Sequence, residues 1–472
     1  MPLTRDIARF VCELDAARIP EAAFATVRRG MADCIGVAFA GSVEPVSAHA
    51  LALIDAASRP GTSRVWAGDA CVDAADAART NAIMAHALDF DDTGLEGHPS
   101  VVLAPVVLAE AERLGSSWRD AVVAYVAGYE TWAELLGRDE DRHHAKGWHP
   151  TAVFGTVAAA AASARMRGLP QAATMNALGI AASMAGGLVA NFGSMTKALQ
   201  VGLAASNGML SATLAERGVT AAADALESPT GLLRAISPSG RVRLDGDCRI
   251  GHDWQIARQG LNIKRYPACY ATHRVIDAAV ELHARLGGQV AAIEEIVIEL
   301  GEMQAAMLRG EPPDSGLDAK FSAPYVVACA LLRGDVRLDD FSEQAVRAPE
   351  LRRLLGRARV VLLSQRDPLE PLFAPADRVR IRMRDGSAVD SAPVQRARGH
   401  ASRPLEPGDL AAKFLACAGS VLGEAGAHDW WAHVRAPDDA PVRWPAAPRP
   451  QAASASQASA GVVMVAAKSM TS

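Results

Sequence analysis

The chain has 472 residues, of which 50% are hydrophobic and 21% are charged, and its formal net charge is −5. This composition predicts a globular protein with a large core, and the slight acidity without a Lys/Arg-rich run argues against nucleic-acid binding. Seven cysteines occur without a C-x-x-C pair, which predicts a reduced, cytoplasmic protein without disulfides, local zinc motifs or iron–sulfur motifs.

Residues 5 to about 260 are predicted to be mainly helical. Segments 121–137 and 198–218 place apolar and small residues at helical spacing, and their many Ala and Gly residues predict close helix packing. The apolar stretch 175–190 is too short to cross a bilayer, so we expect a buried helix there and no membrane span. The first twenty residues lack the apolar core of a signal peptide.

The pattern changes near Lys264, where strand-like segments begin to alternate with helical ones. In 378–391 the apolar residues Val379, Ile381 and Met383 alternate with arginines before an Asp-Gly turn. Further strands are predicted at 293–300 and 357–363, and helices at 273–287, 321–334 and 407–423. The predicted fold class is therefore mainly α, with a large all-helical domain and a smaller α+β domain.

From residue 436 the chain is rich in Pro, Ala and Ser, which predicts a low-complexity, disordered tail at 436–472. The predicted all-helical domain covers 1–263 and the α+β domain covers 264–400. The segment 401–435 returns to helix.

Five short segments combine ionisable residues with Gly, Pro or Thr. The first, HALDFDDTGLEGHPS (86–100), suits a divalent metal by its clustered carboxylates, but it equally suits a helix end with solvated acids. Taken singly, the others also have ordinary interpretations, such as a turn histidine, a surface lysine or a core tyrosine. They are GWHPTA (147–152), GSMTKALQVG (193–202), IKRYPACYATH (263–273) and KFSAPYVVA (320–328).

In this order and spacing, the five segments resemble the MmgE/PrpD family, over residues 5 to about 425. That family includes 2-methylcitrate dehydratase, cis-aconitate decarboxylase and iminodisuccinate epimerase. The resemblance implies a large helical domain completed by 401–435 and a smaller α+β lid domain. It also implies a homodimer and a site between the domains that needs neither a metal nor another cofactor.

The family's site residues are carried over by motif, and their roles are hypotheses. Lys197 and Lys264 are expected to bind substrate carboxylates, His98 and His149 to share acid–base work, and Asp89 to orient a histidine or the substrate. Substrate-binding contacts are expected from Thr93, His273 and Tyr325.

The resemblance predicts a metal-independent lyase acting on a small polycarboxylate. Dehydration of a 2-methylcitrate-like acid is the first expectation, and decarboxylation of a cis-aconitate-like acid is the second. Epimerisation of a dicarboxylate such as iminodisuccinate is the alternative, and a binding protein on an inherited fold also stays open. Two departures leave the substrate open: Gln200 replaces a histidine found in many relatives, and the turn from Thr93 to His98 is short.

Overall fold

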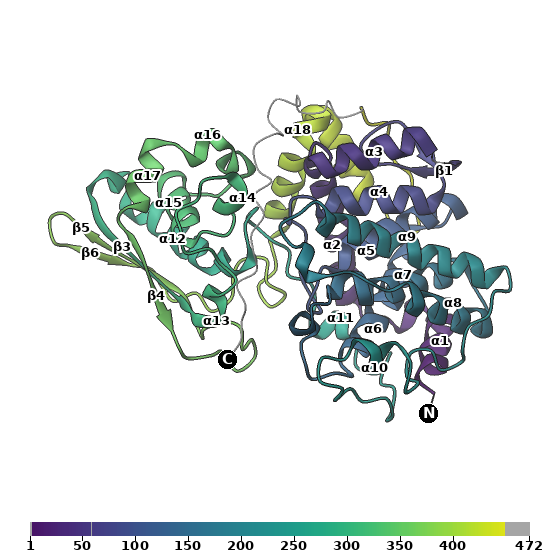
Figure 1. Cartoon of the computed structure of the whole chain (residues 1–472). Helices are drawn as coiled ribbons and strands as arrows, with labels where there is room; N and C mark the ends of the chain where they lie inside the picture. Colours follow the sequence, from purple (N-terminus) through teal and green to yellow (C-terminus); the bar gives the residue numbers. More distant parts are fainter. Residues whose placement is uncertain (1, 58, 449–472) are drawn as a thin grey trace.

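The computed structural model describes residues 2–57 and 59–448 and shows two lobes side by side (Figure 1). The first 260 residues form the larger, helical lobe, and the smaller lobe carries a four-stranded sheet covered by helices. Each lobe has its own hydrophobic core. The predicted fold class, a large helical domain with a smaller α+β domain, is confirmed.

Long helices make up the larger lobe, and a short β-hairpin lies at its edge. The hairpin consists of β1 (Pro60–Arg64) and β2 (Cys71–Val72). The helices are α1 (Leu3–Glu13), α2 (Glu21–Gly41), α3 (Pro45–Ala57), α4 (Ala74–His86), α5 (Pro99–Leu114), α6 (Trp118–Leu136), α7 (Pro150–Arg167), α8 (Gln171–Met184), α9 (Thr196–Glu216), α10 (Leu232–Ile236) and α11 (Gln255–Arg258).

Small side chains let α7 and α9 pack closely, as the Ala- and Gly-rich sequence predicts. The alanine run of α7 is fully buried, and a Cβ on Gly208 of α9 would overlap Ala159 of α7. The prediction of a helix over 175–190 is wrong at its end, because α8 stops at Met184. Gly187 follows with φ of 146°, a conformation that glycine adopts readily and that ends regular helix.

The sheet of the smaller lobe has the strand order β4-β3-β5-β6, and only β3 and β4 are parallel. The predicted alternation holds in β5, where Val379, Ile381 and Met383 are buried and the arginines between them are exposed. The elements are α12 (His273–Leu286), β3 (Ile293–Gly301), α13 (Glu302–Ala305), α14 (Gly316–Ala319), α15 (Ala323–Arg333), α16 (Glu343–Val346), α17 (Pro349–Leu355), β4 (Ala358–Leu363), β5 (Arg378–Met383) and β6 (Ala388–Asp390).

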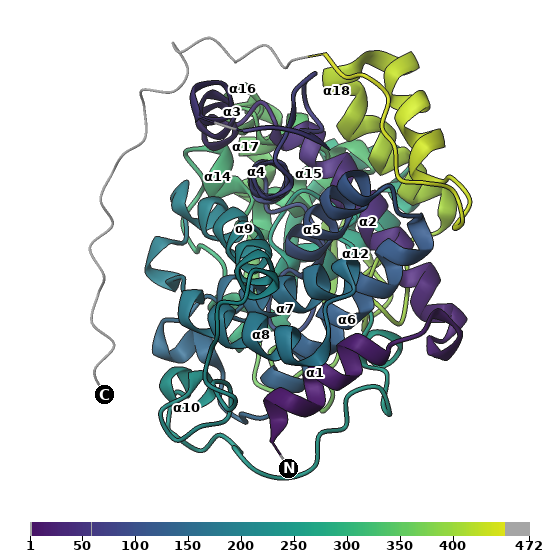
Figure 2. The same ribbon diagram turned by 90° about the vertical axis from the view of Figure 1, so that its right-hand side faces the viewer.

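The chain then returns to the larger lobe through α18 (Pro407–Val434), which packs against α2 (Figure 2). By length and composition α18 is the one single helix in the described chain that could cross a membrane. Its backbone breaks from helical geometry at Gly423, and Lys413 in its first half is buried in an ion pair with Asp33 of α2. The ion pair ties the first half of α18 to the helical lobe.

The predicted disorder of the tail is wrong for its first part. Residues 436–448 pack on the helical lobe, with Val442, Trp444 and Ala447 in its core. The Trp444 ring stacks on Trp430 with 5.1 Å between centroids. Composition did not predict this contact, because a single tryptophan changes the overall composition of a Pro- and Ala-rich segment very little. The rest of the predicted tail, 449–472, lies outside the described residues.

Candidate active site at the acid-rich loop

The acid-rich loop between α4 and α5 forms a closed turn. The Gly94 amide donates to the Gly97 carbonyl at 2.9 Å, and the reverse bond measures 2.8 Å. Thr93 pairs in an antiparallel bridge with Asn262, on the segment that leads into the smaller lobe. Asp89 adopts φ of 53°, a left-handed conformation that non-glycine residues rarely take and that occurs often at functional sites. The turn therefore holds the loop against the boundary between the lobes.

Two lysines from different parts of the chain converge on the Asp89 carboxylate. Lys197 Nζ, from the first turn of α9, lies 2.7 Å from Asp89 Oδ1. Lys264 Nζ lies 3.1 Å from Asp89 Oδ2 and also donates to the Asp89 carbonyl oxygen. Burial favours the neutral acid, but the two ammonium groups hold the pKa of Asp89 well below its usual range. The structure thus joins three of the predicted site residues in one cluster of charges.

His98 lies between this cluster and a second carboxylate. Its Nδ1 is 2.7 Å from Asp91 Oδ2 and 2.9 Å from the Asp92 carbonyl oxygen. Both partners are acceptors, so Nδ1 carries a proton. Nε2 faces the other way and lies 3.6 Å from Asp89 Oδ1. His98 is therefore oriented to give or take a proton through Nε2 at the lysine cluster, as its predicted acid–base role requires.

His86, the last residue of α4, contacts the same Asp91 carboxylate that orients His98. Its Nδ1 lies 3.1 Å from Asp91 Oδ1, so the Asp91 carboxylate holds both His86 and His98. Burial lowers the pKa of His86 to about 4 although Asp91 opposes this, and His86 is neutral at pH 7. Burial also favours protonated Asp91, yet the two imidazoles keep its pKa below the usual range. Asp91 is thus an orienting anion.

His149 is held in one tautomer by Gln200. Gln200 Nε2 donates to the Leu188 carbonyl oxygen at 3.2 Å, which turns Gln200 Oε1 toward His149 Nδ1 at 2.8 Å. His149 Nδ1 therefore donates, and Nε2 has no hydrogen-bond partner in the described part of the chain. Burial lowers the pKa of His149 to about 2, and the positive charge of Lys197 adds to this effect. His149 is neutral across the physiological range.

The structure places three other predicted residues outside this cluster. Thr93 contributes a backbone bridge, and its side chain forms no hydrogen bond with the described residues. His273 is buried against Tyr266 and Tyr270, and burial, followed by the nearby charge of Lys264, lowers its pKa to about 3. Tyr325 is fully buried in the core of the smaller lobe, and its hydroxyl donates to the Asp340 carbonyl oxygen. Substrate binding by these three residues stays a prediction.

Sequence reasoning missed three residues of the surroundings. His86 opens the acid-rich motif and could have been found there, because a histidine ending a helix beside carboxylates is an obvious partner. Lys320 opens the KFSAPY segment and reaches the Leu88 carbonyl oxygen at 3.1 Å. Lys413 lies in an apolar helix without any local motif, and only the packing of α18 on α2 brings it near the site.

A divalent cation fits the acid-rich loop by distance alone. His86, Asp89, Asp91 and His98 each offer a ligand atom within 4.8 Å of the others, and such mixed imidazole and carboxylate sets suit zinc and related metals. However, lysine ammonium groups contact both oxygens of Asp89. A metal ion would have to displace these two cations, which argues against a resident metal in this arrangement.

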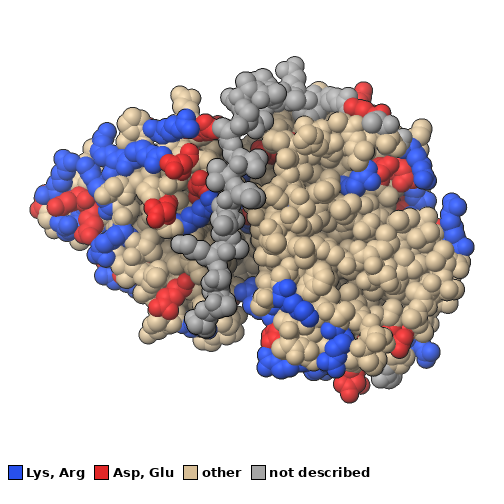
Figure 3. All heavy atoms as spheres, viewed as in Figure 1, with Lys and Arg blue, Asp and Glu red and all other residues tan. Residues whose placement is uncertain are grey.

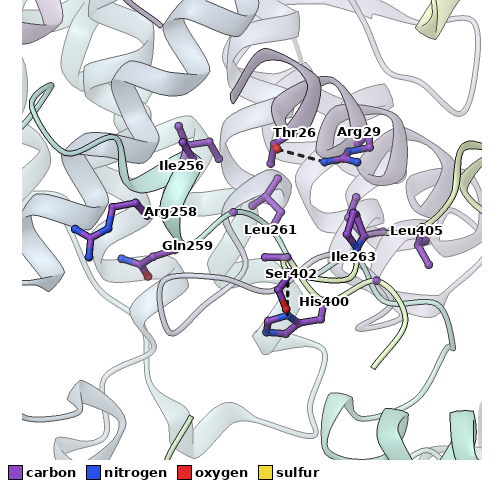
Figure 4. A pocket seen from close by; sticks show the side chains of 15 residues that line it. Thr26, Arg29, Ile256, Arg258, Gln259, Leu261, Ile263, His400, Ser402 and Leu405 are labelled. Carbon is purple, nitrogen blue, oxygen red and sulfur yellow. Dashed lines mark hydrogen bonds between the residues drawn. The ribbon is translucent and has the colours of Figure 1, made fainter. Parts of the chain in front are cut away.

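The surface hollow drawn in Figure 4 is a separate feature. It lies between α2, the segment 256–263 and the segment 399–405, and includes Arg29, Arg258 and His400. None of the predicted site residues lines it. Leu261 and Ile263 line its wall, and Asn262 between them forms the backbone bridge to Thr93. The hollow is therefore next to the acid-rich loop. The predicted site residues of the charged cluster therefore lie apart from this hollow.

Comparisons with known proteins find cis-aconitate decarboxylases among the relatives of this chain. Cis-aconitate decarboxylase of Mus musculus is 30% identical over 437 residues, which cover 89% of this chain and 87% of that protein. The human cis-aconitate decarboxylase is 29% identical, covering 89% of this chain and 88% of that protein, and the Aspergillus terreus decarboxylase is 27% identical, covering 90% of each. Decarboxylases are lyases, so these relatives support the predicted enzyme class, with decarboxylation in place of dehydration.

The match to family models covers both lobes. The MmgE/PrpD N-terminal domain matches residues 5–245, and the MmgE/PrpD C-terminal domain matches residues 266–437. Together they account for most of the described chain, and the predicted resemblance is confirmed. The chain therefore belongs to the MmgE/PrpD family.

Proposed function

We propose that this chain is a lyase that decarboxylates a small unsaturated tricarboxylate such as cis-aconitate. One observation carries the proposal: Lys197 and Lys264 converge on the Asp89 carboxylate beside the free Nε2 of His98. Paired ammonium groups bind carboxylates, and a neighbouring imidazole can move a proton. The decarboxylase names of the relatives add the reaction type.

The residues support each part of such a reaction. One carboxylate leaves as carbon dioxide, and the electron pair of the broken C–C bond moves into the adjacent double bond and carboxylate. Lys197 and Lys264 stabilise this negative charge, because their positive ammonium groups are held beside the carboxylates on which it develops. A proton then adds to carbon from Nε2 of His98 in its imidazolium form, in which both ring nitrogens carry protons. Neutral His149 holds its single proton on Nδ1, so its Nε2 can take up a proton during the reaction. Asp91 keeps the His98 ring in this orientation through its contact with Nδ1.

The chain has the same groups that dehydration would use, but the relatives favour decarboxylation, and none of those named supports epimerisation. We also propose that the reaction needs no metal, since lysine ammonium groups contact the Asp89 oxygens that a cation would need. Full activity after EDTA dialysis is the expected result. Activity that disappeared with EDTA and returned with a divalent metal would contradict this part of the proposal.

Proton NMR of cis-aconitate incubated with the purified protein tests the reaction directly. We expect loss of one carboxylate as carbon dioxide and appearance of an unsaturated dicarboxylate. Lys197→Ala and His149→Ala should each reduce kcat/KM by about a hundredfold or more. Arg347→Ala, which removes an exposed charge of the smaller lobe, is the matched control and should not change it. Wild-type kcat/KM in both site variants would overturn the assignment.

We further propose that the protein is a homodimer through its helical lobe. Figure 3 shows a broad face of this lobe without charged side chains. In the same lobe Leu199, Leu203 and Leu210 form an exposed stripe along α9, each about 40% exposed. Light scattering should give twice the chain mass, and Leu203→Glu should give the monomer. A wild-type monomer would contradict the proposal.

A further inference from the structure

Lys320 is a third lysine at the acid-rich loop, and it comes from the smaller lobe. It follows α14, and its Nζ donates to the Leu88 carbonyl oxygen of the larger lobe at 3.1 Å. Lys197 and Lys264 each contact Asp89, which adjoins Leu88 in the sequence. Lys320 forms no ion pair within 4.0 Å with any described carboxylate. Three ammonium groups therefore lie at one short stretch of backbone, and Lys320 is the one that forms no direct ion pair with the described residues.

The surroundings of Lys320 leave its charge incompletely balanced. Burial lowers the pKa of Lys320, Glu44 and Asp89 oppose this effect, and the charges of Lys264 and Lys197 add to it. Asp89 forms its ion pairs with Lys197 and Lys264, so it acts on Lys320 only from a distance. The Phe341 ring, 5.9 Å from Lys320 Nζ, gives only a weak cation–π contact. A bound anion would supply the direct ion pair that the described residues do not give Lys320.

We propose that Lys320 is a further substrate-binding residue, which takes the third carboxylate of a tricarboxylate whose other carboxylates bind Lys197 and Lys264. This inference rests on the proposed function. Three ammonium groups, from α9, from the boundary segment and from the smaller lobe, can each bind one carboxylate of such a substrate once it displaces Asp89 from Lys197 and Lys264. A dicarboxylate bound to Lys197 and Lys264 would leave Lys320 without a direct ion pair. Lys320 thereby sets the preference for tricarboxylates.

The bond from Lys320 to Leu88 also joins the two lobes at the site. The carbonyl oxygen of Lys320 accepts a hydrogen bond of 2.9 Å from the amide of Cys269, and Cys269 is near Lys264 in the sequence. Lys320 is thus tied by its backbone to the segment that carries Lys264 and by its side chain to the loop that carries Asp89. A substrate bound to Lys320 of the smaller lobe and to Lys197 of the larger lobe would contact both lobes. A third cation from the smaller lobe therefore suits a site at the boundary between the lobes.

Calorimetric titration with unreactive ligands tests this inference. The probes are propane-1,2,3-tricarboxylate, glutarate, which lacks the central carboxylate, and methylsuccinate, which lacks a terminal one. Lys320→Met should weaken tricarboxylate binding about tenfold or more, and it should leave at least one dicarboxylate within about twofold of wild type. The dicarboxylate that is unaffected identifies the carboxylate that Lys320 binds. Arg347→Met, an exposed charge loss in the same lobe, should change nothing.

Two outcomes overturn the role of Lys320. One is unchanged tricarboxylate affinity in Lys320→Met, and the other is an equal loss for all three ligands, which would indicate a general structural or field effect. Lys320→Gln repeats the test with a side chain that keeps a donor, in case the methionine variant does not fold. Wild-type protein that binds the tricarboxylate but does not decarboxylate cis-aconitate would overturn the proposed function alone. Wild-type protein that does not bind the tricarboxylate would overturn both.

Discussion

Lys413 of α18 and Asp33 of α2 form a buried ion pair, with 2.6 Å between Nζ and Oδ1. The same ammonium group donates to the carbonyl oxygens of Phe90 at 2.9 Å and Lys264 at 2.8 Å. Both side chains of the pair are at most 2% exposed. The C-terminal helix therefore fixes the backbone beside Asp89 and at Lys264, and it positions the charged cluster through backbone oxygens and not through its charged groups.

Lys413→Met should destabilise the fold strongly. Removing the ammonium group leaves Asp33 buried without a counter-charge and frees two buried carbonyl oxygens, which should lower the free energy of unfolding by about 3 to 5 kcal/mol. Urea denaturation measures this change. The double variant Lys413→Met with Asp33→Leu should recover part of the loss, because it removes both charges. A single variant within about 1 kcal/mol of wild type would contradict the buried pair.

Gln200 should act as a positioning residue for His149. Gln200→Met removes the acceptor of the His149 Nδ1 proton, so kcat should fall about tenfold while KM changes little. Gln200→Glu places a carboxylate at the same atom and should raise the pKa of His149 from about 2. The acid limb of the pH profile of kcat should then move to higher pH. Identical pH profiles for wild type and Gln200→Glu, measured on cis-aconitate, would exclude this coupling.

Asp92 makes stability depend on pH in a defined direction. It is fully buried and accepts hydrogen bonds from the Ser100 amide and hydroxyl. Burial raises the pKa of Asp92 to about 8, and the bonds with Ser100 oppose this only in part. Between about pH 4 and pH 8 the folded state therefore binds more protons than the unfolded state. The contribution of Asp92 to stability is present at low pH and is lost as pH rises toward 8.

Asp92→Asn should remove this contribution, because asparagine is neutral and keeps similar hydrogen bonds. We expect the variant to gain stability relative to wild type as pH rises from 5 to 8, measured as the difference in unfolding free energy. Other buried acids with raised pKa, such as Glu112 and Glu130, titrate in both proteins and cancel in this difference. A difference that stayed constant with pH would show that Asp92 is ionised in the folded protein.

The sequence predicted the residues of the charged cluster better than the buried residues that position them. Asp89, His98, Lys197 and Lys264 stand in short polar segments next to helix ends, where a local pattern exposes them, and the structure brings them together. Lys413 has no such pattern, since it lies in an apolar helix. Its role depends on the contact of α18 with α2, which joins segments far apart in the chain.

The same distinction holds for the fold. The alternation of Val379, Ile381 and Met383 reports one buried face of a strand, and periodicity alone predicts it. The end of α8 was missed because apolar composition continues past Met184 while the glycines after it allow the backbone to leave the helix. Trp444 was missed because its burial depends on distant partners and not on its Pro- and Ala-rich neighbours.

Trp444 should contribute strongly to the stability of the helical lobe. Besides stacking on Trp430, its ring meets Trp118 edge-on with 5.5 Å between centroids. Trp444→Ala would leave a cavity among these rings and should lower the free energy of unfolding by about 3 to 5 kcal/mol. Trp444→Phe should lose less, and Leu369→Ala, at a side chain 85% exposed, is the control. If thermal melting of Trp444→Ala matched wild type, this segment would add nothing to the core, and the ring contacts would have no energetic weight.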